Sequence, residues 1–256
     1  MRLFTFATSP YARKVRMVLD YKGLSYEPVE RCYSLDHKPD QLAASPRAEV
    51  PALILDDGRT LADSRIICEY LEDAFPSPPL RPSDPYQRAR MRKIEDFCDR
   101  ACDAVNYGYW IAEARKSAPE AAAMSQASRA EFAELLQKLE GELGQGDFFC
   151  GSLSIADLTI ICHVPAVRAM GTDLGGMPRL KAWTARMTAI PAVRGDRQRL
   201  VQALAKVHDI SSELVGRDGR IHWRDRRLEW PVRRGFIDFV AREFHGGTMM
   251  FPPQAT

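Results

Sequence analysis

A serine near the start of the chain stands where a short apolar segment gives way to a predicted helix. Ser9 precedes Pro10, and proline suits the first position of a helix because its missing N–H would have no partner there. Ser9 is therefore the expected N-cap, so that its hydroxyl and the first free amides of the helix point at one small volume. An anion in that volume would meet a hydrogen-bond donor and the positive end of the helix dipole. A bound thiolate is one anion that such a site favours.

A second polar pair could bind the two charged groups of an amino acid. Asp63 and Ser64 stand at the start of a predicted helix that runs to Phe75. A carboxylate and a hydroxyl at a helix N-terminus can bind an ammonium and a carboxylate together. Taken alone, however, Ser9 and the Asp63–Ser64 pair are more often plain helix caps without a ligand.

Composition and charge indicate a protein that acts in solution. The chain has 256 residues, of which 45% are apolar and 27% charged, as is ordinary for a soluble globular protein. Its formal net charge of +2 predicts no long-range attraction to nucleic acid or to a membrane. The first apolar run, residues 3–6, is too short for a secretory signal, and no stretch approaches the length of a membrane span. We therefore expect a cytoplasmic location.

The cysteines favour the same location. Six cysteines, at positions 32, 68, 98, 102, 150 and 162, show no close paired spacing, so reduced thiols fit better than a disulfide framework. Cys98 and Cys102 are one helical turn apart and His163 adjoins Cys162, but no close cysteine pair indicates a zinc site. We expect these cysteines to pack in the core and the protein to hold no metal.

The N-terminal part of the chain predicts a compact α/β domain over residues 1–77. Apolar segments, turn signals and helical spacing indicate the order β-α-β-α-β-β-α, with one parallel crossover and one hairpin at Asp57-Gly58. This is a thioredoxin-like arrangement. The predicted strands are residues 2–6, 26–30, 50–55 and 59–62, and the predicted helices are 10–22, 38–44 and 64–75.

Residues 76–85 contain five prolines and indicate a linker, after which the chain reads as all-helical. Apolar residues recur at helical spacing over 91–105 and 126–143. A further buried helix is expected to begin at Ser154, which forms a capping box with Asp157. The sequence thus predicts a second, all-α domain over residues 86–195.

Four local signatures occur in order along these two domains, and together they resemble the cytosolic glutathione transferase superfamily over residues 1–195. The similarity is greatest to bacterial transferases of the Ser-Pro-Phe type, which are related to the tau and omega classes. The signatures are Ser9-Pro10-Tyr11, Val50-Pro51, Asp63-Ser64 and the Ser154–Asp157 capping box.

The resemblance implies a role for each of these residues. Glutathione is the implied co-substrate, and Ser9 would donate a hydrogen bond to its sulfur, so that the thiolate attacks a hydrophobic or aromatic electrophile. A cis bond before Pro51 would leave the Val50 backbone free to pair with the cysteinyl part of glutathione. Asp63 and Ser64 would hold the γ-glutamyl end.

The resemblance also implies a pocket for the small electrophile and a homodimeric assembly, with neither nucleic acid nor membrane as a partner. Tyr11, Tyr107 and Trp110 are the expected pocket residues, although on the residues alone the aromatic cluster at 107–110 could equally be core. Two alternatives to transferase activity stay open: a glutathione-dependent lyase that cleaves β-aryl ethers, and a regulatory or scaffold protein with little turnover. A thiol-disulfide reductase is disfavoured because the chain has Ser9 where that chemistry needs cysteine.

Residues 196–256 extend beyond the part that resembles the family. The segment is too aromatic for a disordered tail, and we predict a helical C-terminal extension. Its arginines alternate with acidic residues, which favours a solvated, salt-bridged face over a nucleic-acid surface. We expect it to pack on the helical domain or on a dimer partner, or to cap the electrophile pocket.

Overall fold

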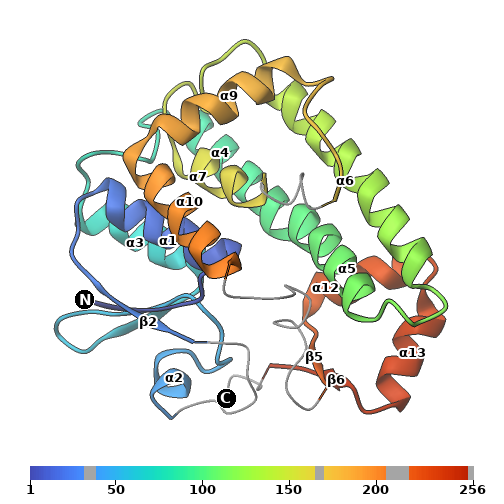
Figure 1. Cartoon of the computed structure of the whole chain (residues 1–256). Helices are drawn as coiled ribbons and strands as arrows, with labels where there is room; N and C mark the ends of the chain where they lie inside the picture. Colours follow the sequence, from blue (N-terminus) through green and yellow to red (C-terminus); the bar gives the residue numbers. More distant parts are fainter. Residues whose placement is uncertain (32–38, 165–169, 206–218, 253–256) are drawn as a thin grey trace.

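A computed structural model describes residues 1–31, 39–164, 170–205 and 219–252 (Figure 1). Its N-terminal domain contains a mixed four-stranded sheet with the strand order β2-β1-β3-β4. β1 pairs in parallel with β2 and antiparallel with β3, which forms the hairpin with β4. This confirms the thioredoxin-like prediction. The elements are β1 (Arg2–Thr5), α1 (Pro10–Tyr21), β2 (Glu27–Glu30), α2 (Pro39–Ala44), β3 (Ala52–Ile54), β4 (Thr60–Ala62) and α3 (Ser64–Ala74).

The second domain is helical, as predicted. The capping box at Ser154 is present, and Asp157 also accepts hydrogen bonds from the Phe149 amide and from Nε1 of Trp183. A single π-helical turn, which the sequence did not indicate, separates α4 from α5. The elements are α4 (Pro85–Phe97), η1 (Cys98–Cys102), α5 (Asp103–Ala114), α6 (Ala121–Leu143), α7 (Ile155–His163), α9 (Pro178–Ala189) and α10 (Pro191–Leu204).

The C-terminal segment adds two helices and two short strands: β5 (Ile221–His222), α12 (Asp225–Arg233), α13 (Ile237–His245) and β6 (Met249–Met250). β5 and β6 pair in parallel, so the segment is not purely helical. The predicted boundary between residues 195 and 196 falls inside α10. We call the part that the structure describes after α10, residues 219–252, the tail; its helix α12 packs against α5 (Figure 1).

Helix α1 connects the two domains. It packs against α3 in its own domain and against α7 and α10 of the helical domain. Two of its arginines, Arg13 and Arg16, share the buried carboxylate of Asp196 at 2.9 and 3.1 Å. On the same helix, Nζ of Lys14 lies 2.7 Å from Glu95 of α4. The N-terminus of α1, where Ser9 lies, is therefore held in a fixed position at the domain junction.

The described cysteines are buried and free, which confirms their expected place in the core; they are Cys68, Cys98, Cys102, Cys150 and Cys162. Position 32 lies outside the described residues. No group of three or more His, Cys, Asp or Glu side chains within the described ranges is arranged to hold a metal ion. None of the helices described combines the length and the apolar character that a membrane span requires.

Candidate functional site

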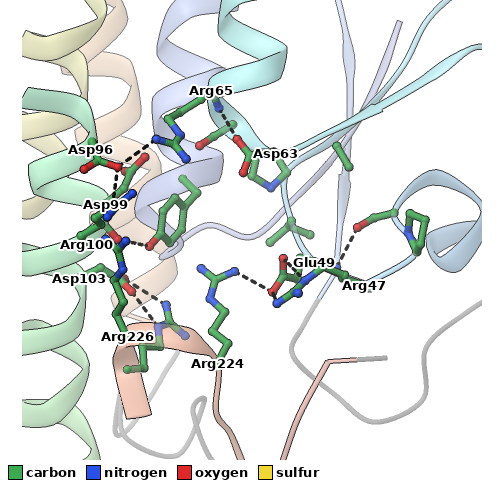
Figure 2. Close-up of a pocket in the computed structure, with 18 residues that line it drawn as sticks. Arg47, Glu49, Asp63, Arg65, Asp96, Asp99, Arg100, Asp103, Arg224 and Arg226 are labelled. Carbon is green, nitrogen blue, oxygen red and sulfur yellow. Dashed lines mark hydrogen bonds and ion pairs between the residues drawn. The ribbon is translucent and has the colours of Figure 1, made fainter. Parts of the chain in front are cut away.

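A cavity of about 710 Å³ lies where the N-terminal domain, the helical domain and the tail meet (Figure 2). This volume is within the usual range of small-molecule sites, roughly 300–1,000 Å³. Its lining is charged rather than aromatic, with six arginines and five carboxylates. The arginines are Arg47, Arg65, Arg100, Arg224, Arg226 and Arg227, and the acids are Glu49, Asp63, Asp96, Asp99 and Asp103.

One side of the cavity brings together four of the predicted site residues, Val50, Pro51, Asp63 and Ser64. The bond between Val50 and Pro51 is cis, as expected. Asp63 is the N-cap of α3 and accepts a hydrogen bond from the Arg65 amide at 2.8 Å. Its φ of 76° is unusual for a residue with a side chain. A helix N-terminus with a carboxylate and a hydroxyl therefore faces this cavity.

Ser9 is the N-cap of α1, as predicted, but it does not line the cavity. Its side chain accepts a hydrogen bond from the Ala12 amide at 3.4 Å, and the residue is only 2% exposed. Within the described part of the chain, the Ser9 hydroxyl proton has no acceptor. The hydroxyl can therefore both cap the helix and donate to an atom that reaches it.

Tyr11 does line the cavity, as predicted for the electrophile pocket. Its hydroxyl donates to the Asp99 carbonyl at 3.1 Å, and the Arg224 guanidinium lies 4.9 Å from the centre of its ring. Burial raises the pKa of the Tyr11 hydroxyl well above its usual value, with a further contribution from Asp103. Tyr11 is therefore a neutral hydrogen-bond donor at ordinary pH.

Tyr107 and Trp110, the other two residues expected in the electrophile pocket, are not among the residues that line this cavity. Tyr107 is buried, its hydroxyl donates to the His222 carbonyl, and its ring meets the edge of Trp223 at 6.1 Å. The tail thus covers the face of α5 that carries Tyr107. Trp110 packs against Tyr109 with ring centres 5.1 Å apart.

The acids of the cavity are neutralised by arginines from distant parts of the chain. Asp103 receives two hydrogen bonds from Arg227, at 2.8 and 3.1 Å. Burial alone would raise the pKa of the Asp103 carboxyl, but the charge of Arg227 outweighs it and holds that pKa at about 2. Glu49 lies 2.8 Å from Nη1 of Arg224. These ion pairs connect the tail to both domains at the edge of the cavity (Figure 2).

Asp99 is a cavity acid whose pKa is raised. It lies in the π-helical turn η1, a kind of distortion that occurs frequently at functional sites. Burial raises the pKa of its carboxyl to about 6, opposed by Lys14 and reinforced by Glu95. Nζ of Lys14 lies 3.3 Å from the Asp99 carboxylate.

The sequence pattern did not identify the tail arginines as part of this site. The alternation of arginines and acids predicted a solvated face, but the Arg227 side chain is only 6% exposed. The acids that pair with Arg224 and Arg227 are Glu49 and Asp103, which are more than a hundred residues away in the sequence. Such pairings follow from tertiary packing alone.

Comparisons with known proteins agree with this architecture. Family models for the N-terminal and C-terminal domains of glutathione S-transferases match residues 3–79 and 109–186. A probable glutathione S-transferase of Zea mays is 30% identical over 227 residues, which cover 79% of this chain and 93% of that protein.

Two solved structures extend the likeness. A glutathione S-transferase of Methylobacterium radiotolerans in complex with glutathione sulfonate matches with a TM-score of 0.68 at 29% identity, over 76% of this chain and 93% of that one. A β-etherase of a Sphingobium strain matches with a TM-score of 0.65 at 26% identity, over 77% and 98% of the two chains. The chain therefore belongs to the cytosolic glutathione transferase superfamily.

Proposed function

We propose that the protein is a glutathione transferase that binds glutathione in the 710 Å³ cavity. The observation that carries the proposal is the meeting of Val50, Asp63 and Ser64 on one side of that cavity. Ser64 and the first amides of α3 suit the γ-glutamyl carboxylate, and Asp63 suits its ammonium group. The Val50 backbone would pair with the cysteinyl part of glutathione in the manner of an added strand.

In this proposal the N-terminus of α1 stabilises the thiolate. A free thiol has a pKa of about 8.5. A hydrogen bond from Ser9 to the charged sulfur contributes roughly 1.5–3 kcal/mol, and the helix end adds up to about 1 kcal/mol. Together they lower the thiol pKa by about one to two units. The sulfur then forms a bond to the electrophilic carbon, the leaving group departs with the bonding electrons, and the thiol proton goes to solvent.

A β-aryl ether-cleaving lyase is the second candidate, supported by the structural similarity to the Sphingobium β-etherase. It would use the same thiolate, but the leaving group would be an aryl oxide. Turnover of a β-aryl ether in preference to aryl halides would favour this candidate. Glutathione binding without turnover of either class would instead favour a regulatory or scaffold role.

We also propose two further properties, a homodimeric assembly and a cytoplasmic location. A homodimer is typical of this superfamily, and a solution mass of twice the 28.9 kDa of one chain would support it. The free cysteines of the core agree with a reducing cytoplasm.

Replacement of Asp63 by Asn tests the glutathione site. Asn keeps the N-cap oxygen and tolerates the positive φ, so the variant removes the charge and little else. We expect the KM for glutathione to rise about tenfold with little change in kcat, because the contact is the same in the ground state and the transition state.

Asp84 offers a matched control for this experiment. It is also an exposed N-cap, accepts from the Gln87 amide at the same 2.8 Å, and lies outside the cavity. Asp84→Asn should leave the KM for glutathione unchanged. Equal glutathione KM values in wild type and Asp63→Asn would place the γ-glutamyl site elsewhere and contradict the proposal.

A further inference from the structure

The tail spans the cavity from one domain to the other. At one end, Arg227 is held by Asp103 of α5. At the other end, Arg224 is held by Glu49, next to Val50 on the opposite side of the cavity. Between these anchored residues stands Arg226, which lines the cavity and is half-buried. Figure 2 shows Arg224 and Arg226 on the α12 side and Asp63 across the cavity from them.

Most charges that line the cavity already have a partner. Asp96 binds both Arg65 and Arg100, at 3.2 and 2.5 Å. Glu49 binds Arg47 as well as Arg224, and Asp103 binds Arg227. Two lining residues, Asp63 and Arg226, form no ion pair with any side chain that the structure describes. Asp63 suits the ammonium group of glutathione, so Arg226 is, among the described residues that line the cavity, the cation that forms no ion pair.

Arg226 lies in the first turn of helix α12, which begins at Asp225. Arg226 is therefore a half-buried guanidinium on the side of the cavity opposite the γ-glutamyl site. A guanidinium in such a place favours a planar oxyanion such as a carboxylate, which it can bind with two parallel hydrogen bonds.

We infer that the electrophilic co-substrate carries a carboxylate and that Arg226 of the tail binds it. The inference rests on the proposed glutathione site and adds to it the chemical class of the second substrate. It narrows the hydrophobic or aromatic electrophile expected from the resemblance to one that also carries a carboxylate. It also gives the tail a function, because this selectivity comes from a segment outside the matched family domains.

A pair of electrophiles that differ in charge and by one methyl group tests this inference. The probes are 4-chloro-3-nitrobenzoate and its methyl ester, in which glutathione sulfur displaces chloride. We expect the wild-type protein to have a lower KM for the acid than for the ester. Arg226→Gln should raise the KM for the acid about tenfold, the loss of one charge-assisted contact, and leave that for the ester unchanged. Arg226→Lys should have a KM for the acid between those of the wild type and Arg226→Gln.

Arg233→Gln is the matched control, because Arg233 lies on the same helix but is paired with Glu131 and lies outside the cavity. It should leave both KM values unchanged. Binding of the two product conjugates, S-(4-carboxy-2-nitrophenyl)glutathione and its methyl ester, gives a calorimetric readout that does not depend on turnover. The acid conjugate should lose about tenfold in affinity in Arg226→Gln.

Three results would overturn the inference. Equal changes in the KM values for acid and ester in Arg226→Gln would show that Arg226 does not bind the charged group of the electrophile. Weaker binding of glutathione itself in Arg226→Gln, with no acid preference in the wild type, would assign Arg226 to glutathione. No binding of glutathione to the wild type would remove the proposed function, and the inference with it.

Discussion

At the scale of single residues, two hydroxyls compete for the role of thiol activation. Tyr11 faces the cavity, but its proton is already used in the bond to the Asp99 carbonyl. Ser9, at the N-terminus of α1, is not among the lining residues, and its proton has no acceptor among the described residues. Because the helix dipole also favours charge at Ser9, we propose that Ser9 rather than Tyr11 contacts the thiolate.

The variants Ser9→Ala and Tyr11→Phe separate these two donors. The thiolate absorbance of bound glutathione, followed against pH, should shift upward by about one unit in Ser9→Ala and stay in place in Tyr11→Phe. The kcat of Ser9→Ala should fall with little change in the KM for glutathione. Melting temperatures provide the control, because loss of the N-cap alone costs about 1 kcal/mol. A pKa shift confined to Tyr11→Phe would assign the role to Tyr11.

Residues close in sequence to a helix start could be predicted, whereas residues brought together by packing could not. Ser9, Asp63 and Ser64 are recognisable because capping is local chemistry that depends on a few neighbouring positions. The contact of Tyr107 with the tail could not be predicted, because nothing near it in the sequence shows that the tail covers it. The partners of Arg227 and Arg224 were missed for the same reason, since each pair joins distant segments.

At the scale of elements, the contact between α5 and α12 decides how the tail is held. Trp230 of α12 is 2% exposed and lies directly over Gly108 of α5, and its Nε1 donates to Glu131 of α6 at 2.7 Å. A Cβ added at Gly108 would lie 2.6 Å from Cε3 of Trp230, closer than van der Waals contact allows. Glycine at this position therefore permits the close approach of the two helices.

Gly108→Ala should destabilise the protein by about 1–3 kcal/mol, because the extra methyl displaces a buried indole. Gly141→Ala in α6 is the control, since an added Cβ there has no neighbour within 4 Å. That substitution should stabilise by about 0.5–1 kcal/mol through helix propensity. Urea unfolding of both variants measures the difference, and limited proteolysis should cleave the tail sooner in Gly108→Ala. Similar gains in both variants would mean that Trp230 does not constrain α5.

The predicted strands and helices agree closely with the structure in the N-terminal domain and less closely in the tail. The signals for β1, α1 and α3 are strong, with a short apolar run, a proline at a helix start and clear caps. The strands β5 and β6 have two residues each, too few for any alternation pattern to be visible. The π-helical turn η1 also has no sequence signature, since its apolar residues continue the spacing of the flanking helices.

At the scale of the whole molecule, the tail adds buried aromatic contacts and ion pairs to the helical domain. It buries Trp223, Trp230 and Phe239, and it supplies partners for Asp103 and Glu131 of the helical domain. Burial of each aromatic side chain stabilises by roughly 1.5–3 kcal/mol. Without the tail, Asp103 would also lose the guanidinium that compensates its burial, which is costly for a charged group.

Deletion of residues 206–256 should therefore lower the melting temperature or the soluble yield. Glutathione binding should persist in the protein that folds, because Val50, Asp63 and Ser64 all lie in the N-terminal domain. Any preference for an acidic over an esterified electrophile should disappear together with Arg226. Calorimetry measures the melting temperature and the glutathione affinity of the truncated and the full-length chain. The KM values for the acid and the ester measure the preference of each. A truncated protein that melts like its parent, from which protease removes the tail quickly, would show that the tail is a loose appendage and not part of the site.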